Sequence, residues 1–225
     1  MLIDSPSGRR TGLSPHECCL CSQIDGMAAN DLIARLLPDQ PYRRRIMLEN
    51  RSFAVIPSLG PLVSGHSLLC PKAHVTRFAE LDPDVYDDFR GIRNALVERL
   101  RDLYGNRVHL FEHGAAASGA RVLCTVDHAH LHVLPLPDDI DAVRGNWATF
   151  DGSLGTLKRK VQGREYILYE TPDGVARLMV SHACSIESQY MRKKLANRLG
   201  QPTAWDWRVA PEALKADAAW RQFLS

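Results

Sequence analysis

The chain has 225 residues, of which 45% are hydrophobic and 24% charged, and its formal net charge is +2. This composition allows a normal soluble core and excludes global disorder, while so small a net charge gives no argument for nucleic-acid binding. No apolar run approaches the roughly 20 residues of a membrane-spanning helix, and residues 1–14 lack the apolar segment of a signal peptide. We therefore expect a cytoplasmic protein whose partner is neither a membrane nor a nucleic acid.

The first half of the chain alternates short apolar runs with one long helix. Residues 1–15 are rich in Ser, Gly, Pro and Arg, which predicts a flexible arm. Asp31 or Asn30 can cap a short helix over 31–37. Apolar residues recur at helical spacing over 82–104, which predicts a long helix opened by Asp82 and Pro83. Strands are expected at 45–48, 53–56, 66–70, 108–112 and 122–134.

The pattern changes after Pro137. Residues 145–155 are typical of a loop, and two β-rich segments at 165–169 and 176–180 flank a turn signal. A helix is expected at 188–199, and a short helix should end the chain. The fold class is therefore α+β, an antiparallel sheet with a long helix packed across it. We expect the main domain at 16–140 and a C-terminal α/β extension at 141–225 that packs on it.

Three histidines alternate with apolar residues at His128, His130 and His132. On a strand, residues two apart point to the same face, so the three imidazoles should line up while their neighbours enter the core. A metal-binding strand and a chance polar edge are the alternatives. A neutral imidazole is a competent nucleophile near pH 7, and its attack on phosphorus would split one displacement into two easier steps. The row therefore favours phosphoryl chemistry.

Two further groups accompany the row. Gly65 lets the backbone turn before a strand that His66 and His74 flank. Cys18 and Cys21 have the two-residue gap of a zinc knuckle, and His74 and His128 would complete a tetrahedral site. A cluster of reduced thiols without metal is the alternative.

Together these motifs resemble the histidine triad (HIT) family from about Cys18 to Pro137. The resemblance implies a HIT-like fold, a homodimer, and a nucleotide as the partner. It implies that His130 is the nucleophile and carries the nucleotidyl intermediate, that His66 and His132 contact the phosphate, and that Thr125 supplies a donor to it. It also implies a structural zinc held by Cys18, Cys21, His74 and His128. The activity implied is hydrolysis or transfer at the α phosphate, as in diadenosine polyphosphate hydrolases.

The chain departs from the family pattern at two places. Ser58 stands where many members have an acidic residue or Asn for the ribose hydroxyls, and Cys124 stands where many have Gln. In the extension, Gln189 and Arg192 are three positions apart on one helical face, where they can close over phosphates; the alternative is a solvated face. Two other functions remain open: a non-catalytic nucleotide-binding protein, and a zinc-dependent hydrolase that uses the histidine row as metal ligands.

Overall fold

The computed structural model describes residues 18–105, 107–116, 126, 128–137, 140, 143, 147–182, 185–209 and 211–225. The predicted arm at 1–15 lies outside them. The helices are α1 (Cys19–Asp25), α2 (Leu32–Leu36), α3 (Tyr86–Tyr104), α4 (Leu154–Val161), α5 (Tyr190–Arg198) and α6 (Ala213–Leu224), with short 3-10 turns at Ala28–Asn30, Phe78–Glu80 and Pro83–Val85. The strands are β1 (Leu48–Glu49), β2 (Phe53–Pro57), β3 (Ser67–Pro71), β4 (Arg107–Gly114), β5 (Leu131–Leu136), β6 (Ala148–Phe150), β7 (Tyr166–Glu170) and β8 (Ala176–Val180).

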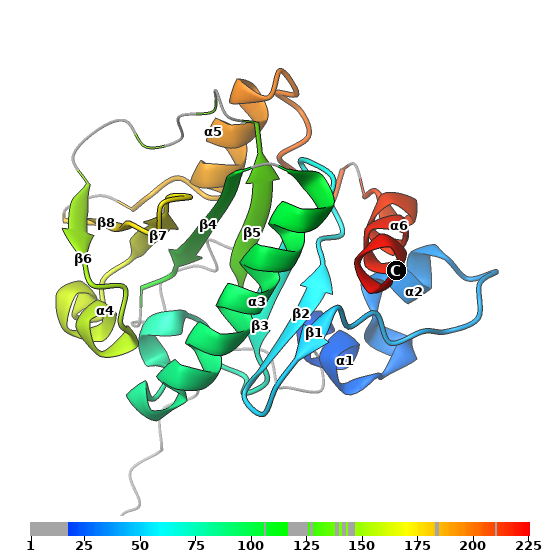
Figure 1. Cartoon of the computed structure of the whole chain (residues 1–225), viewed down its shortest axis with the longest axis horizontal. Helices are drawn as coiled ribbons and strands as arrows, with labels where there is room; N and C mark the ends of the chain where they lie inside the picture. The colour runs from blue at the N-terminus through cyan, green and yellow to red at the C-terminus, as the bar shows by residue number, and fades with distance from the viewer. Residues whose placement is uncertain are drawn as a thin grey trace, which may run out of the picture.

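The strands form one antiparallel sheet in the order β1-β2-β3-β5-β4-β7-β8-β6, and α3 crosses one face of it (Figure 1). The predicted α+β class, with a long helix across an antiparallel sheet, is therefore confirmed. β4 pairs with β5 along one edge and with β7 along the other. The C-terminal segment thus continues the sheet of the first half, and β4 has no free edge at which a second copy can pair.

The long helix forms where the sequence predicts it. Asp82 caps the 3-10 turn before it by accepting from the N–H of Asp84 at 3.0 Å, and Gly105 ends it in the left-handed conformation, with φ of 62°. The helix buries one apolar face against the sheet, through Phe89, Ile92, Leu96, Val97 and Leu100.

The alternation of β5 divides the sheet into two faces. Leu131 and Val133 enter the core beneath α3, whereas Leu134 packs on the other face with Met191 and Leu195 of α5. His132 lies between Leu131 and Val133 in sequence, so it points to the α5 face as well. On that same face α1 packs against β2 and β3, through residues such as Ile56 and Leu68. The α5 face therefore has a helix at each side, with the histidine row between them.

The last helix returns to the beginning of the described chain (Figure 1). Asp217 of α6 forms a buried ion pair with Arg45, at 2.6 Å, and the indole N–H of Trp220 donates to the carbonyl of Ile46 at 3.1 Å. The C-terminal segment is thus fastened to both ends of the sheet. Within the part of the chain that the structure describes, no helix is both long and apolar enough to cross a lipid bilayer.

Several elements differ from the prediction, and the strand expected at 45–48 is confined to β1 at Leu48–Glu49. The long strand expected at 122–134 begins only at Leu131, and residues 117–125 and 127 lie outside the described part. The helix α1 over Cys19–Asp25 was not predicted, and the Sγ of Cys18 caps it by accepting from the N–H of Cys21 at 3.5 Å. The segment at 145–155, expected to be a loop, contains β6 and the start of α4. Ser153 caps α4 by accepting from the N–H of Thr156 at 3.2 Å.

Candidate active site

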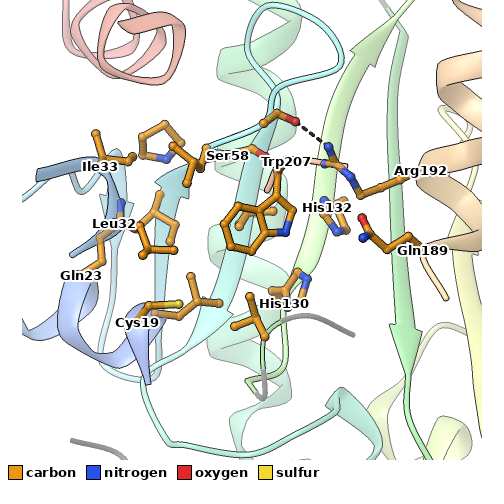
Figure 2. A pocket seen from close by; sticks show the side chains of 17 residues that line it. Cys19, Gln23, Leu32, Ile33, Ser58, His130, His132, Gln189, Arg192 and Trp207 are labelled. Carbon is orange, nitrogen blue, oxygen red and sulfur yellow. Dashed lines mark hydrogen bonds between the residues drawn. The ribbon is translucent and has the colours of Figure 1, made fainter. Parts of the chain in front are cut away.

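A pocket lies on the face opposite α3, between α1 and α2 on one side and α5 on the other (Figure 2). Apolar residues form most of the wall near α1 and α2, including Leu20, Leu32 and Ile33. The opposite end is polar. The residues at that end are His130, His132, Gln189 and Arg192. The pocket therefore has one end suited to a flat apolar group and another suited to a phosphate.

His130 presents one nitrogen to this pocket. Its Nδ1 lies 2.7 Å from the carbonyl oxygen of His128 and must donate to it, because a carbonyl only accepts. In a neutral imidazole the proton is then on Nδ1, and Nε2 keeps its lone pair. Burial is the main cause that lowers the pKa of His130 below its ordinary value, and the Arg192 charge acts in the same direction. Burial therefore favours the neutral ring, in which Nε2 is available as a nucleophile.

His66 and His132 form a hydrogen-bonded pair beside it. The Nε2 of His66 lies 2.9 Å from the Nδ1 of His132, and the Nδ1 of His66 accepts from the N–H of Leu62 at 3.1 Å. Burial lowers the pKa of both imidazoles well below the ordinary value. Because both rings are neutral, the proton of His66 is on Nε2 and that of His132 is on its own Nε2. His132 is thereby fixed as a donor that lines the pocket next to His130.

The third histidine of the row belongs to a different cluster. The Nδ1 of His128 lies 3.5 Å from the Sγ of Cys18 and 3.3 Å from the Sγ of Cys21. The Nδ1 of His74 lies 3.3 Å from the Sγ of Cys21. The four ligand atoms all lie within 4.8 Å of one another. The cluster links α1, the segment after β3 and the residues before β5.

This cluster fits a tetrahedral zinc ion. Two thiolates at about 2.3 Å and two imidazoles at about 2.0 Å from a metal place sulfur and nitrogen about 3.5 Å apart, which agrees with the distances above. The Nε2 of His128 donates to the carbonyl of Pro71 at 2.9 Å, so its Nδ1 carries the lone pair that a metal requires. Such a bond to the remote nitrogen is usual for histidines that bind metal.

The three histidines therefore do not converge on a single point, and the expectation that they share one face of a strand is wrong. His128 and His130 precede β5, and only His132 lies within it. His128 points to the cysteines, while the Nδ1 of His132 is engaged by His66. This geometry also argues against a catalytic zinc held by all three.

The C-terminal segment supplies the remaining polar wall. Arg192 is buried, and its Nε donates to the carbonyl of Trp205 at 2.7 Å while its Nη2 donates to that of Gly60 at 2.8 Å. The guanidinium thus lies at the pocket as predicted, but it directs these two nitrogens to backbone carbonyls. Gln189 precedes α5 instead of lying within it, and its side chain also lines the pocket.

The sequence-based site residues divide into three groups. His66, His130, His132, Gln189 and Arg192 come together around the pocket, and Cys18, Cys21, His74 and His128 form the second cluster. Thr125 and Cys124 lie outside the described residues. Ser58 is buried and lines the pocket. Trp207 was missed as a site residue. It belongs to the Trp-Asp-Trp-Arg segment, whose two tryptophans in a polar stretch were the available signal (Figure 2).

Part of the chain is similar to known proteins. Residues 42–138 match the sequence model of the HIT domain. The chain is 29% identical over 87 residues to the uncharacterized HIT-like protein Rv1262c of Mycobacterium tuberculosis, a match of 39% of this chain and 58% of that protein. It thus spans 58% of the length of this relative.

Solved structures with a similar outline include a HIT family protein from Bacillus subtilis, at 17% identity and a TM-score of 0.42 over 64% of this chain and 94% of that one. Another is yeast Ap4A phosphorylase Apa2 in complex with AMP, at 18% identity and a TM-score of 0.43 over 73% of this chain and 76% of that one. The family match at 42–138 contains His66, His74 and the whole histidine row. Residues 42–138 of this chain are therefore similar to the HIT domain.

Proposed function

We propose that this protein is a nucleotidyl hydrolase or transferase in which the Nε2 of His130 attacks the α phosphate of a nucleotide. The observation that carries the proposal is the bond from Nδ1 of His130 to the carbonyl of His128, at 2.7 Å. It holds the ring in the tautomer with a free Nε2, which is what a nucleophilic imidazole requires. The neighbouring polar end can take the phosphate, and the apolar end near α1 and α2 can take the nucleoside.

The reaction follows in two displacements. In the first, the lone pair on Nε2 of His130 forms a bond to phosphorus, and the leaving group departs with the electron pair of the bond it loses. The imidazole becomes cationic, and its Nδ1–H bond to the carbonyl of His128 stabilises that charge. The Nε2–H of His132 donates to a phosphoryl oxygen as charge develops. In the second, water or another hydroxyl attacks phosphorus, releases its proton, and returns the electron pair to Nε2.

The experiment compares the wild-type protein with His130→Ala on a nucleoside phosphoramidate, a dinucleoside polyphosphate and a nucleotide sugar. We expect turnover of at least one of them by wild type and none by His130→Ala. His182→Ala serves as the control because His182 is exposed and bonds to Arg164, away from the pocket. Wild-type rates in His130→Ala would exclude the proposal. A protein that binds nucleotides without turning over any of them would favour the non-catalytic alternative.

We infer that Cys18, Cys21, His74 and His128 hold a structural zinc ion. When bound, the metal would supply folding free energy and no chemistry at phosphorus. The cluster is connected to the active site through His128, because the backbone carbonyl of His128 orients the ring of His130. The homodimer implied by the resemblance and the cytoplasmic location expected from the sequence composition remain predictions. A dimer would use a surface other than β4, since that strand is paired on both sides.

A further inference from the structure

Gln189 has a buried side chain whose amide is unused. The residue is 8% exposed, and neither its Oε1 nor its Nε2 has a hydrogen-bond partner within the described part of the chain. Buried polar groups are almost always paired, because an unpaired one keeps the full cost of its desolvation. Figure 2 shows this amide directed from the α5 side towards His132 and the pocket. A ligand in the pocket could supply the missing hydrogen-bond partners of this amide.

The backbone of Gln189 is also unusual. Its φ of 57° and ψ of 28° are left-handed, a conformation that residues with a Cβ adopt rarely and that is concentrated at functional sites. Gln189 precedes the first turn of α5, yet its side chain makes no capping bond. The local fold therefore does not use this amide to stabilise the helix. Both the backbone and the side chain reduce stability and leave a polar group facing the site.

The charge of the pocket restricts what the ligand can be. Among the described residues that line it, Arg192 is the single cation, and its Nε and Nη2 already donate to carbonyls. His132, the buried imidazole beside it, has its Nδ1 engaged by His66. A polyphosphate leaving group brings several negative charges that these residues do little to balance. A leaving group of low charge fits better.

We propose that Gln189 is a specificity residue that selects a leaving group carrying an N–H or O–H donor beside the scissile bond. The inference rests on the proposed function. The Nε2–H of Gln189 donates to a phosphoryl oxygen, and its Oε1 accepts from the donor on the leaving group. A phosphoramidate nitrogen or a sugar hydroxyl supplies this donor to Oε1. A polyphosphate offers only acceptors there at neutral pH, so Oε1 stays unpaired.

Binding measurements test this directly. We would measure by calorimetry the Kd of adenosine 5′-phosphoramidate, whose nitrogen is a donor, and of AMP, whose phosphate is an acceptor. His130→Ala is the background, so that neither ligand is consumed. Adding Gln189→Met should weaken phosphoramidate binding by about tenfold or more and AMP binding by less. Equal losses for the two ligands, no loss, or no binding of either ligand to the protein that keeps Gln189 would overturn the proposal.

Gln162→Met is the matched control. Gln162 is also left-handed, with φ of 49°, but it ends α4 and is exposed. This variant should change neither Kd. Gln189→Met should keep or raise the melting temperature, because an apolar side chain of the same shape removes an unpaired buried amide. A large fall in melting temperature would show that Gln189 is structural and would overturn the inference.

A second readout separates this inference from the proposed function. With the phosphoramidate as substrate, kcat/KM should fall about tenfold or more in Gln189→Met and stay unchanged in Gln162→Met. If wild type forms a nucleotidyl adduct on His130 but Gln189→Met matches it in rate, only the role of Gln189 fails. If wild type forms no adduct on any substrate, the proposed function fails.

Discussion

The Nε2 of His66 lies 2.9 Å from the Nδ1 of His132, and this contact decides which proton His132 offers to the pocket. The N–H of Leu62 occupies the other nitrogen of His66 at 3.1 Å. A backbone group thus sets the tautomer of His66, and His66 in turn sets that of His132. Orientation of a reactive histidine by a partner on its remote nitrogen is what fixes its role in catalysis.

Replacing His66 should therefore disturb His132. In His66→Leu, the Nδ1 of His132 loses its donor, and the ring can place its proton on either nitrogen. We expect kcat to fall by about tenfold or more, the range associated with one lost donor or a wrong tautomer. Nitrogen NMR of labelled histidine should show the Nε2–H form of His132 in wild type and a mixture in the variant. An unchanged tautomer in His66→Leu would contradict the relay, and the exposed His182→Leu should alter neither measurement.

The stability of the fold should depend on pH through Glu112. Burial raises the pKa of this carboxyl to about 7, against about 4.3 in an unfolded chain. It accepts from the N–H of Phe78 and from the hydroxyl of Tyr166, both at 2.7 Å. The charge of Arg77 lowers the pKa and that of Glu80 raises it, but burial is the largest cause.

The folded state holds the Glu112 proton more tightly than the unfolded state does. Its contribution to stability is thus complete below about pH 4.3 and is lost as the pH rises through about 7, at a cost of up to about 4 kcal/mol. Glu112→Gln, which resembles the protonated form, should make the free energy of unfolding less dependent on pH between about 4 and 7. Denaturant titrations at several pH values measure this slope, and an equal slope in both proteins would show that Glu112 is not its source.

We expect nucleotide binding to require glycine at position 60, because Trp207 packs closely against it. A Cβ at this position would lie 2.4 Å from the Cβ of Trp207 and 2.9 Å from its Cα, so Gly60→Ala must move the backbone that carries the indole. We expect weaker nucleotide binding, by about tenfold. Gly91→Ala is the control, because a Cβ there meets nothing within 4 Å. It lies within α3 and should stabilise the protein by roughly 0.5–1 kcal/mol. Normal nucleotide binding by Gly60→Ala would contradict a contribution of Trp207, which lines the pocket, to nucleotide binding.

Zinc binding should depend on Cys21 and not on the neighbouring Cys19. Cys21→Ser removes one of the four clustered ligands, so the purified protein should contain much less than one zinc per chain and melt at a lower temperature. Cys19 lies outside the cluster, and Cys19→Ser should retain the metal. Elemental analysis and melting curves check both. Wild-type protein that is free of zinc and equally stable would refute the site.

The sequence predicted most of the elements that carry an apolar repeat. The helix after Asp82 and the hairpin of β7 and β8 were found because side-chain periodicity reports directly on a buried face. The start of β5 was predicted wrongly. The side chain of His128 contacts cysteines from a distant segment, and that of His130 bonds to a local carbonyl. Alternation alone carries no information about such partners. The short strand β6 was missed because three residues give too little pattern.

Candidate site residues could be chosen from the sequence where they belong to a recognisable motif. His66, Cys18 and His74 were found through spacing and resemblance. The hydrogen bonds from Arg192 to two backbone carbonyls were not predicted, because those carbonyls belong to Gly60 and Trp205, which are far apart in the sequence. The unpaired amide of Gln189 was equally hidden, since its burial depends on how the extension folds back onto the sheet.

The most direct test of the central claim is the isolation of the covalent intermediate. Wild-type protein would be mixed with a substrate labelled at its α phosphorus, quenched in alkali within milliseconds to seconds, digested, and analysed by mass spectrometry. Our account predicts a nucleotidyl group on the Nε2 of His130 that is labile in acid and absent from His130→Ala. Turnover by wild type with no adduct at any time, or an adduct on another residue, would contradict it.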